Sequence, residues 1–306
     1  MIGQALFWNP TRALKNPDGT LNILYGSDNV NPLAYNEAYF DNPKVTTVIA
    51  NIAPSYKITK DLEYKMQYSL TYSTGVRKQY TTAYINITDV AIDATSGKGG
   101  EANVAENQLT TNQITHTLSY VKDITAKINL NAVAGYEYLK TKFSGNSMYA
   151  RRFIPTDKPY YYFMASSDPT TRREYGFANP TEELQSYFGR AVVNISNKYI
   201  ITATIRADGS TKFGENNKYG YFPSFAGAWF IGREDFMNGI KVIKDLKIRA
   251  GWGITGNQEF PGGQSIITYG LSGANPATFQ QNTIANPDLK WEENQTFNVR
   301  FNWRHS

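Results

Sequence analysis

The chain of 306 residues contains no cysteine and no long apolar run. Without cysteine, a disulfide scaffold, a cysteine zinc site and a thiol nucleophile are all excluded. A membrane-spanning helix needs roughly 18 consecutive apolar residues. No stretch approaches that length, and the mean hydropathy is −0.47. A helical membrane protein is therefore excluded.

Strong charge and low complexity are also absent. The 31 Lys and Arg against 26 Asp and Glu give a net charge of only +5, with no run of five basic residues, so nucleic-acid binding is not indicated. Aromatic residues make up 14% of the chain, which excludes disorder. The abundant residues are 22 Tyr, 28 Asn and 29 Thr. Because Tyr and Thr favour strands and Asn favours turns, the composition predicts an all-β protein.

The hydrophobic pattern repeats every second residue. From Leu62 to Ser73 every even-numbered residue is apolar and every odd-numbered residue is polar, and residues 124–138 follow the same pattern. Such alternation places apolar and polar side chains on opposite faces of a strand. The pattern predicts nine strands, at 44–58, 61–74, 110–122, 124–142, 184–197, 199–209, 219–232, 245–256 and 291–303.

Short and long connections alternate along this series of strands. Short turns fall near residues 59–60, 122–123 and 197–198, whereas long loops span 75–109, 143–183 and 257–290. Antiparallel up-and-down order gathers the short turns at one end, which is typical of a transmembrane β-barrel of the outer membrane. A soluble antiparallel sheet with one face on a core predicts the same alternation and stays open as the alternative.

In a barrel the apolar face contacts outer-membrane lipid and the polar face lines the lumen. The charged residues of the polar face are candidate contacts for water, substrate or a domain inside the barrel. They are Lys127, Glu137, Arg206, Asp208, Lys247, Arg249 and Arg300.

Glycine and proline positions within the strands carry further predictions. Asp208-Gly209 is expected to close a hairpin that needs a positive φ. Pro223 is expected at a bulge or an irregular rim position, because it lacks a ladder donor. Gly251 and Gly253 allow either a close approach from inside the barrel or a bend of the strand.

No catalytic, metal or cofactor site is predicted. The chain has two histidines, His116 and His305, and neither has a second His or a Cys nearby to form a metal site. Neither is placed for a Ser-His-Asp triad. The run 97–100, GKGG, lacks phosphate-loop spacing and is interpreted as a flexible loop tip. We therefore expect a protein that is not an enzyme.

One long loop is rich in aromatic and basic residues. Aromatic faces stack on sugars or peptide side chains, and arginine pairs with carboxylates or phosphates. The loop is a candidate for substrate or partner contacts, and the alternative is that its aromatics simply pack it against its neighbours. The candidate residues are Tyr149, Arg151, Arg152, Tyr160, Tyr161 and Tyr162.

Three sequence runs resemble a known family. They are RADGSTKFGENNKYGYFPSFAGAW at 206–229, DLKIRAGWGITGNQ at 245–258 and NPDLKWEENQTFNV at 286–299. In this order they are similar to the C-terminal barrel region of SusC/RagA-type TonB-dependent outer-membrane transporters of Bacteroidota. The turns at 16–20, NPDGT, and 31–33, NPL, resemble a loop that precedes a mid-barrel strand in that family.

The resemblance implies active import of glycans or peptides, driven through TonB, with a SusD-like surface lipoprotein as the lid. Residues 1–306 would then be part of the receptor barrel, an incomplete barrel without the plug domain, the TonB box and the signal peptide of the family. The resemblance carries over no residue as a binding site. An outer-membrane adhesin or receptor that binds a protein through its loops is the alternative function.

Overall fold

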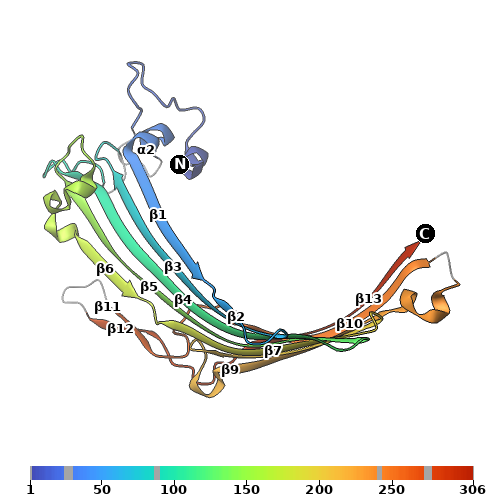
Figure 1. Ribbon diagram of the computed structural model, residues 1–306. Helices are drawn as coiled ribbons and strands as arrows, with labels where there is room; N and C mark the ends of the chain where they lie inside the picture. The colour runs from blue at the N-terminus through green and yellow to red at the C-terminus, as the bar shows by residue number, and fades with distance from the viewer. Residues whose placement is uncertain (1, 24–29, 86–89, 240–242, 272–277, 306) are drawn as a thin grey trace. The chain divides into compact units, whose positions relative to one another are not determined.

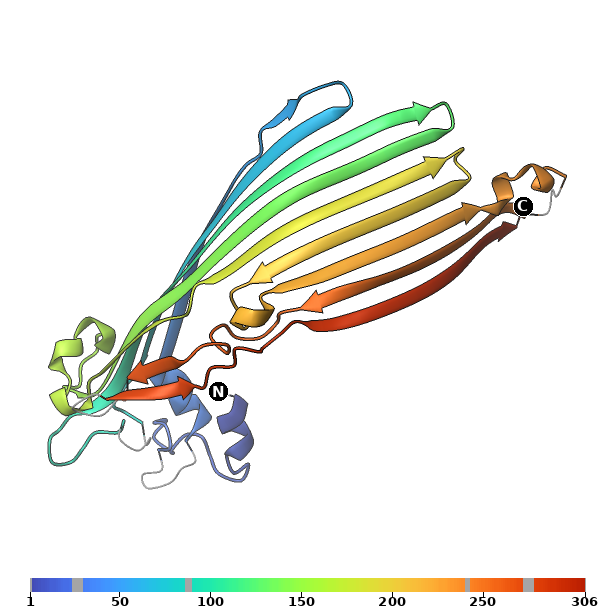
Figure 2. The same ribbon diagram turned by 90° about the horizontal axis from the view of Figure 1, so that it is seen from below.

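The computed structural model describes residues 2–23, 30–85, 90–239, 243–271 and 278–305 (Figures 1 and 2). The chain forms two compact units. The first unit comprises Met1–Thr47, Tyr72–Leu109 and Phe143–Ala178. The second comprises Val48–Thr71, Thr110–Lys142 and Asn179–Ser306.

The described residues are mainly β-strands, with a few short helices. The helices are α1 (Ile2–Phe7), α2 (Pro32–Ala38) and the 3-10 helices η1 (Tyr160–Tyr162), η2 (Met164–Ser166), η3 (Pro169–Thr171), η4 (Glu215–Asn217), η5 (Ile231–Arg233) and η6 (Asp235–Met237). The strands are β1 (Tyr39–Ile52), β2 (Ser55–Lys57), β3 (Leu62–Thr81), β4 (Gly99–Thr125), β5 (Ile128–Phe153), β6 (Arg173–Ala178), β7 (Glu182–Ile195), β8 (Tyr199–Ser210), β9 (Tyr219–Phe230), β10 (Ile243–Asn257), β11 (Thr268–Leu271), β12 (Phe279–Thr283) and β13 (Glu292–His305). None of the described helices is long and apolar enough to cross a bilayer.

One sheet of 11 strands contains all nine predicted strands. Its order is β1-β3-β4-β5-β7-β8-β9-β10-β13, with β2 added to β3 and β6 added to β5, while β11 and β12 form a separate pair. Among the described residues β1 and β13 are the two edges, so the sheet is not closed. The prediction of an incomplete, antiparallel, up-and-down barrel wall is confirmed.

Three strands are much longer than the sequence pattern predicts. β3, β4 and β5 have 20, 27 and 26 residues. A tilted strand crosses a bilayer with about 9–11 residues. The first-unit portions of these strands therefore extend beyond the hydrocarbon region. There neither face has to contact lipid, so the strict apolar alternation disappears although the strand pairing continues.

The strands of the second unit have one exposed apolar face. Ile201, Ile205 and Phe225 are more than half exposed, and Tyr187 and Tyr221 follow the same alternation. A soluble sheet would cover such a face, whereas a barrel presents it to lipid.

The tight connections of the second unit lie at one end of its strands (Figure 2). The β4–β5 turn uses residues 126–127 and the β7–β8 turn uses residues 196–198. In the latter turn Ser196 and Asn197 have φ of 53° and 56°. The predicted turn positions are confirmed, except that the β4–β5 turn lies a few residues later than expected.

The prediction for Gly209 was wrong, and Pro223 lies at the end of a ladder and not at a bulge. Gly209 closes no hairpin: it lies inside β8, paired with Gln185 and Tyr219, and an added Cβ would come within 2.7 Å of the Tyr219 ring. Pro223 stands at no bulge, because the β8–β9 register continues through it. The β9–β10 ladder ends at the pair of Ser224 with Gly253, so the position of Pro223 lies beyond the last pair.

Gly251 and Gly253, for which the sequence allows a close approach from inside the barrel or a bend, have neighbours within the sheet. A Cβ on Gly253 would lie 2.9 Å from the Cβ of Ser224 on β9. A Cβ on Gly251 would meet only ordinary contacts, the nearest at 3.6 Å on Asn298.

Candidate functional site

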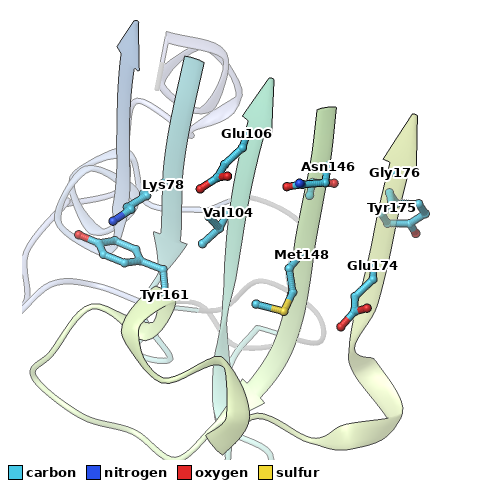
Figure 3. A pocket seen from close by; sticks show the side chains of 10 residues that line it. Lys78, Val104, Glu106, Asn146, Met148, Tyr161, Glu174, Tyr175 and Gly176 are labelled. Carbon is cyan, nitrogen blue, oxygen red and sulfur yellow. The ribbon is translucent and has the colours of Figure 1, made fainter. Parts of the chain in front are cut away.

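The candidate site is a groove on one face of β3, β4, β5 and β6 in the first unit. Figure 3 shows its larger part, a cavity of about 640 Å³ lined by residues that include Lys78, Glu106, Asn146, Tyr161 and Glu174. A second cavity of about 460 Å³ shares Met148, Tyr161 and Glu174 with the first. It continues past Ala150, Tyr162, Met164, Ala165 and Arg172. We call the two cavities together the β5 groove.

Strand pairing positions the floor of the β5 groove. Met148 on β5 is opposite Glu174 on β6, and Asn146 is opposite Gly176. Opposed residues of an antiparallel pair point to the same face, so these four positions line one surface. η1 and η2 then add Tyr161, Tyr162 and Met164 from the connection between β5 and β6.

The three consecutive tyrosines have different environments. Tyr160 is 1% exposed and stacks on Phe153 with a centroid distance of 4.9 Å, so its ring belongs to a small core and not to the surface. Tyr161 is partly buried and meets Tyr80 edge to face at 5.6 Å. Tyr162 is 66% exposed. Burial removes Tyr160 from the predicted contact surface, whereas Tyr162 remains available.

The buried Tyr160 ring accounts for two glycines of the run 97–100, which the sequence predicts to be a flexible loop tip. Gly99 and Gly100 begin β4, both are buried, and Gly100 has φ +80°. A Cβ on Gly100 would clash with Cε2 of Tyr160. The prediction of a flexible tip was therefore wrong for these two residues, because the strand start packs closely against the tyrosine ring.

The opposite face of the same strands carries a polar network. The Tyr149 hydroxyl donates to Glu101 at 2.7 Å, and Thr81 donates to the same carboxylate at 3.1 Å. Arg151 donates to the Tyr149 hydroxyl oxygen and lies over its ring. Burial and the Glu101 carboxylate raise the pKa of Tyr149 to about 12. Tyr149 therefore stays a neutral hydrogen-bond donor in the physiological pH range.

The two arginines of the aromatic loop do not line the β5 groove. Arg151 and Arg152 line a separate cavity of about 190 Å³, together with Tyr149 and Arg173. Arg152 has φ 56° and pairs with Asp168 at 3.7 Å. The structure thus divides the six predicted loop residues between a buried ring, the groove and this small cavity.

Three of the predicted polar-face residues form one network in the second unit. Arg206 donates through Nε to both oxygens of Asp208, at 2.7 and 2.8 Å, and through Nη2 to Ser186 at 2.8 Å. Its Nη2 also reaches Glu137 at 3.4 Å. Gln113 donates to the other Glu137 oxygen at 2.8 Å. Ser186 is fully buried and Asp208 is 7% exposed, so these polar groups satisfy one another.

The other predicted polar-face residues lie apart from this network. Lys127 is not on a strand face at all, because it lies in the β4–β5 turn, where its carbonyl accepts from Ser196. Lys247 lies over the Phe230 ring at 4.0 Å. Arg249 donates to Asn302 at 2.9 Å and is opposite Arg300 in the ladder.

His116 belongs to a row of stacked rings in the second unit. Its Nδ1 lies 2.6 Å from the Tyr64 hydroxyl, and its ring lies between Tyr64 and Tyr136 at centroid distances of 6.0 and 6.3 Å. Tyr136 continues the row to Tyr187 at 5.2 Å. No cluster of metal-binding side chains occurs within the part of the chain that the structure describes.

The long alternating strands, the exposed apolar face and the polar opposite face define a segment of a transmembrane β-barrel wall. The family model described as "TonB dependent receptor-like, beta-barrel" matches residues 5–306. The chain belongs to this family and is part of an outer-membrane β-barrel.

The relatives with the most informative names are receptors of Bacteroidota. The chain is 32% identical to TonB-dependent receptor P3 of Formosa agariphila over 98% of its own length, but it covers only 29% of that receptor. It is 34% identical to TonB-dependent receptor SusC of Bacteroides thetaiotaomicron, over 45% of the chain and 15% of SusC. The chain thus spans less than a third of these relatives.

Solved structures show the same fold. The structure of the RagAB peptide transporter matches with a TM-score of 0.80 at 20% identity, over 94% of this chain and 32% of that chain. The RagAB peptide importer in its "open-open" state matches with a TM-score of 0.77.

Sequence reasoning missed the acidic residues and methionines of the β5 groove. Glu106 and Glu174 lie in segments without clear alternation, and Met148 precedes the aromatic loop. In the sequence, the extension of the strands is indicated only by the length of the hydrophilic segments between the predicted strands, at 75–109 and 143–183.

Proposed function

We propose that this chain forms part of the barrel wall of a SusC-like, TonB-driven transporter that imports glycans or peptides across the outer membrane. The observation that carries the proposal is the family match over residues 5–306, together with the similarity to SusC. The fold agrees with that of the RagAB peptide transporter, to which the chain is 20% identical. The energy for import would come from TonB.

The polar network around Arg206 supports a lumen-facing role. Glu137, Arg206 and Asp208 share one face, opposite the exposed apolar residues such as Ile205. A charged face of this kind suits contact with water, substrate or a domain inside a barrel. Lys247, Arg249 and Arg300 are proposed to serve the same face.

The loop between β5 and β6 is proposed to contact the substrate or a SusD-like lipoprotein lid. Tyr162 supports this role because its ring is 66% exposed and Lys78 lies over it at 5.4 Å. An exposed aromatic ring beside a cation is a common anchor at interfaces. The buried Tyr160 acts indirectly, by holding the loop against the strands.

The test of import is deletion of the whole gene, followed by growth and uptake assays on defined glycans and peptides. Loss of growth on one substrate class, restored by the intact gene, is expected.

The loop is tested by Tyr162→Ala, with Tyr84→Ala as a control because Tyr84 is 60% exposed in the same unit. Unchanged uptake and unchanged co-purification of the lipoprotein in Tyr162→Ala would contradict the loop role. Uptake that survives deletion of the gene would contradict import.

A further inference from the structure

A small cavity at the end of β5 is lined by three arginines. It lies in the first unit, where β5, η3 and β6 meet, and it has a volume of about 190 Å³. At roughly 30 Å³ per water molecule, this volume admits one small charged group and a few waters. The described lining contains no acidic residue and consists of Tyr149, Arg151, Arg152, Thr170, Thr171 and Arg173. We call this cavity the arginine pocket.

An unusual backbone conformation brings two of the arginines together. Consecutive residues of a strand point to opposite faces, so Arg151 and Arg152 of a regular strand would not line one cavity. Arg152 has φ 56°, in the left-handed region that residues other than glycine seldom adopt. Strand pairing supplies the third arginine, because Arg173 on β6 is opposite Tyr149 on β5. A strained backbone that gathers like charges is typical of a ligand-binding site.

Two carboxylates close to the pocket are engaged outside its lining. One oxygen of Asp168 accepts from the amide and the hydroxyl of Thr170 at 2.9 and 2.7 Å, and the other lies 3.7 Å from Arg152. Glu101 accepts from the Tyr149 hydroxyl at 2.7 Å. The three arginines against these two carboxylates leave an excess of one positive charge.

Arg173 carries this excess charge. It makes no ion pair with any described residue, and its Nη1 donates to the carbonyls of Thr170 and Arg172 at 3.0 and 2.9 Å. Its Nε and Nη2 donate to none of the described residues, and the side chain is exposed. Lys98 and Asp93 lie within electrostatic range of the pocket, but their charges are opposite and offset each other. Arg173 therefore has two donor groups to offer to an anionic ligand.

We propose that the arginine pocket binds a tetrahedral oxyanion, the sulfate or phosphate ester group of a soluble ligand. Arginine presents a planar fork of donors that matches such oxygens, and opposite charges strengthen the hydrogen bonds. An ester group of this kind has three terminal oxygens for the three guanidinium groups, whereas a carboxylate has two.

The pocket differs from the β5 groove and from a lipid site. Glu174 and Met148 line the β5 groove from the other face of the strands. A soluble ligand is favoured over a lipid phosphate, because the first-unit portions of these strands extend beyond the hydrocarbon region. Binding of the oxyanion does not depend on whether the protein imports glycans or peptides.

The test is surface plasmon resonance on the full-length protein, immobilised in detergent and kept at constant ionic strength. The probes are glucose 6-sulfate, glucose 6-phosphate, glucuronic acid and glucose. The Kd of both esters should be about ten-fold lower than that of glucose, because hydrogen bonds to a charged group are the stronger ones. Glucuronic acid should bind about three-fold more weakly than the esters, because its carboxylate engages fewer of the donors.

Removal of the Arg173 guanidinium should weaken binding of the esters selectively. Arg173→Gln should raise their Kd about ten-fold and leave the Kd of glucose unchanged. Arg173→Lys keeps the charge but loses the fork of donors, so it should raise the Kd about three-fold. The matched control is Arg12→Gln, which should bind like the unmodified protein, because Arg12 is an exposed arginine of the first unit outside the pocket. Resistance to unfolding in SDS without heating verifies that each variant folds.

Four results would overturn the proposal. Two concern the probes, namely esters that bind no more tightly than glucose, or glucuronic acid that binds as tightly as the esters. The third is an Arg173→Gln variant that binds the esters as well as Arg12→Gln does. The fourth is binding of purified lipopolysaccharide but of neither ester, lost in Arg173→Gln, which would assign the pocket to a lipid phosphate.

Discussion

Removal of Arg206 should destabilise the barrel wall by about 2–3 kcal/mol. Its guanidinium makes two hydrogen bonds to Asp208, one to Ser186 and one to Glu137. Without it, the two carboxylates face each other with no cation between them. Breaking a buried ion pair by removing one partner costs about 3–5 kcal/mol. The Arg206 side chain is 36% exposed, against 10% for Asp208 and 20% for Glu137, so solvent reduces that cost.

The variant Arg206→Met keeps much of the side-chain volume and removes the charge. Arg190→Met is the matched control, since the Arg190 side chain on β7 is exposed and makes no hydrogen bond or ion pair with the residues described. The control should change the free energy of unfolding by less than about 0.5 kcal/mol. Adding Asp208→Asn to Arg206→Met should recover about 1 kcal/mol, because one of the two uncompensated carboxylates is then gone.

The assay is urea unfolding of the full-length protein in detergent, followed by tryptophan fluorescence. Equal stability of Arg206→Met and Arg190→Met would refute the reasoning. A double variant that is less stable than Arg206→Met would also refute it, because the instability would then not come from unpaired carboxylates.

Three further effects are expected. Gly100→Ala should make the β5–β6 loop sensitive to protease, because φ +80° is strained for alanine and the new Cβ would strike Tyr160, at a cost of more than about 1 kcal/mol. Phe213→Ala should destabilise the protein by about 3–4 kcal/mol in urea unfolding, because the ring is 1% exposed and packs with two other aromatic rings. Glu234 accepts hydrogen bonds from Tyr199, Trp229 and Lys198, which lower its pKa to about 2. The stability that this carboxylate contributes is present above pH 4.5 and is lost as the pH falls from 4.5 towards 2, so Glu234→Gln should flatten the pH dependence of unfolding over that range.

Each of these effects has a control or a contrary result. Gly97→Ala also places alanine at positive φ, +66°, but meets nothing within 4 Å, so it should cost less than Gly100→Ala. Equal protease sensitivity in the two glycine variants would show that the contact with Tyr160 is unimportant. Normal stability of Phe213→Ala would mean that its aromatic cluster is dispensable. If Glu234→Gln unfolds with the same pH dependence as the unmodified protein, Glu234 is not the group whose protonation lowers the stability below pH 4.5.

Alternation predicted the strands wherever one face meets lipid. In 62–72 and 128–138 the outward positions have to be apolar, so the pattern and the strand coincide. Beyond the membrane neither face has to contact lipid, and residues 99–109 and 143–153 show no such pattern although they pair in the same strands. Strand ends were therefore predicted well at the tight turns and poorly at the other end.

The β5 groove could not be predicted because its residues come from separate segments. Glu106, Asn146, Tyr161 and Glu174 are brought together only by the pairing of β4, β5 and β6 and by the fold of η1. The Arg206 network was easier, because alternation placed Glu137, Arg206 and Asp208 on one face. The sequence did not show that Ser186 completes it.

The row of rings formed by Tyr64, His116, Tyr136 and Tyr187 has a consequence for how the protein folds. It crosses four adjacent strands, β3, β4, β5 and β7. A slip of one residue in any pairing would turn one ring to the polar face and break the row. The four rings therefore favour the correct register. This matters most between β3 and β4 and between β5 and β7, because long connections join these strands and cannot fix their pairing.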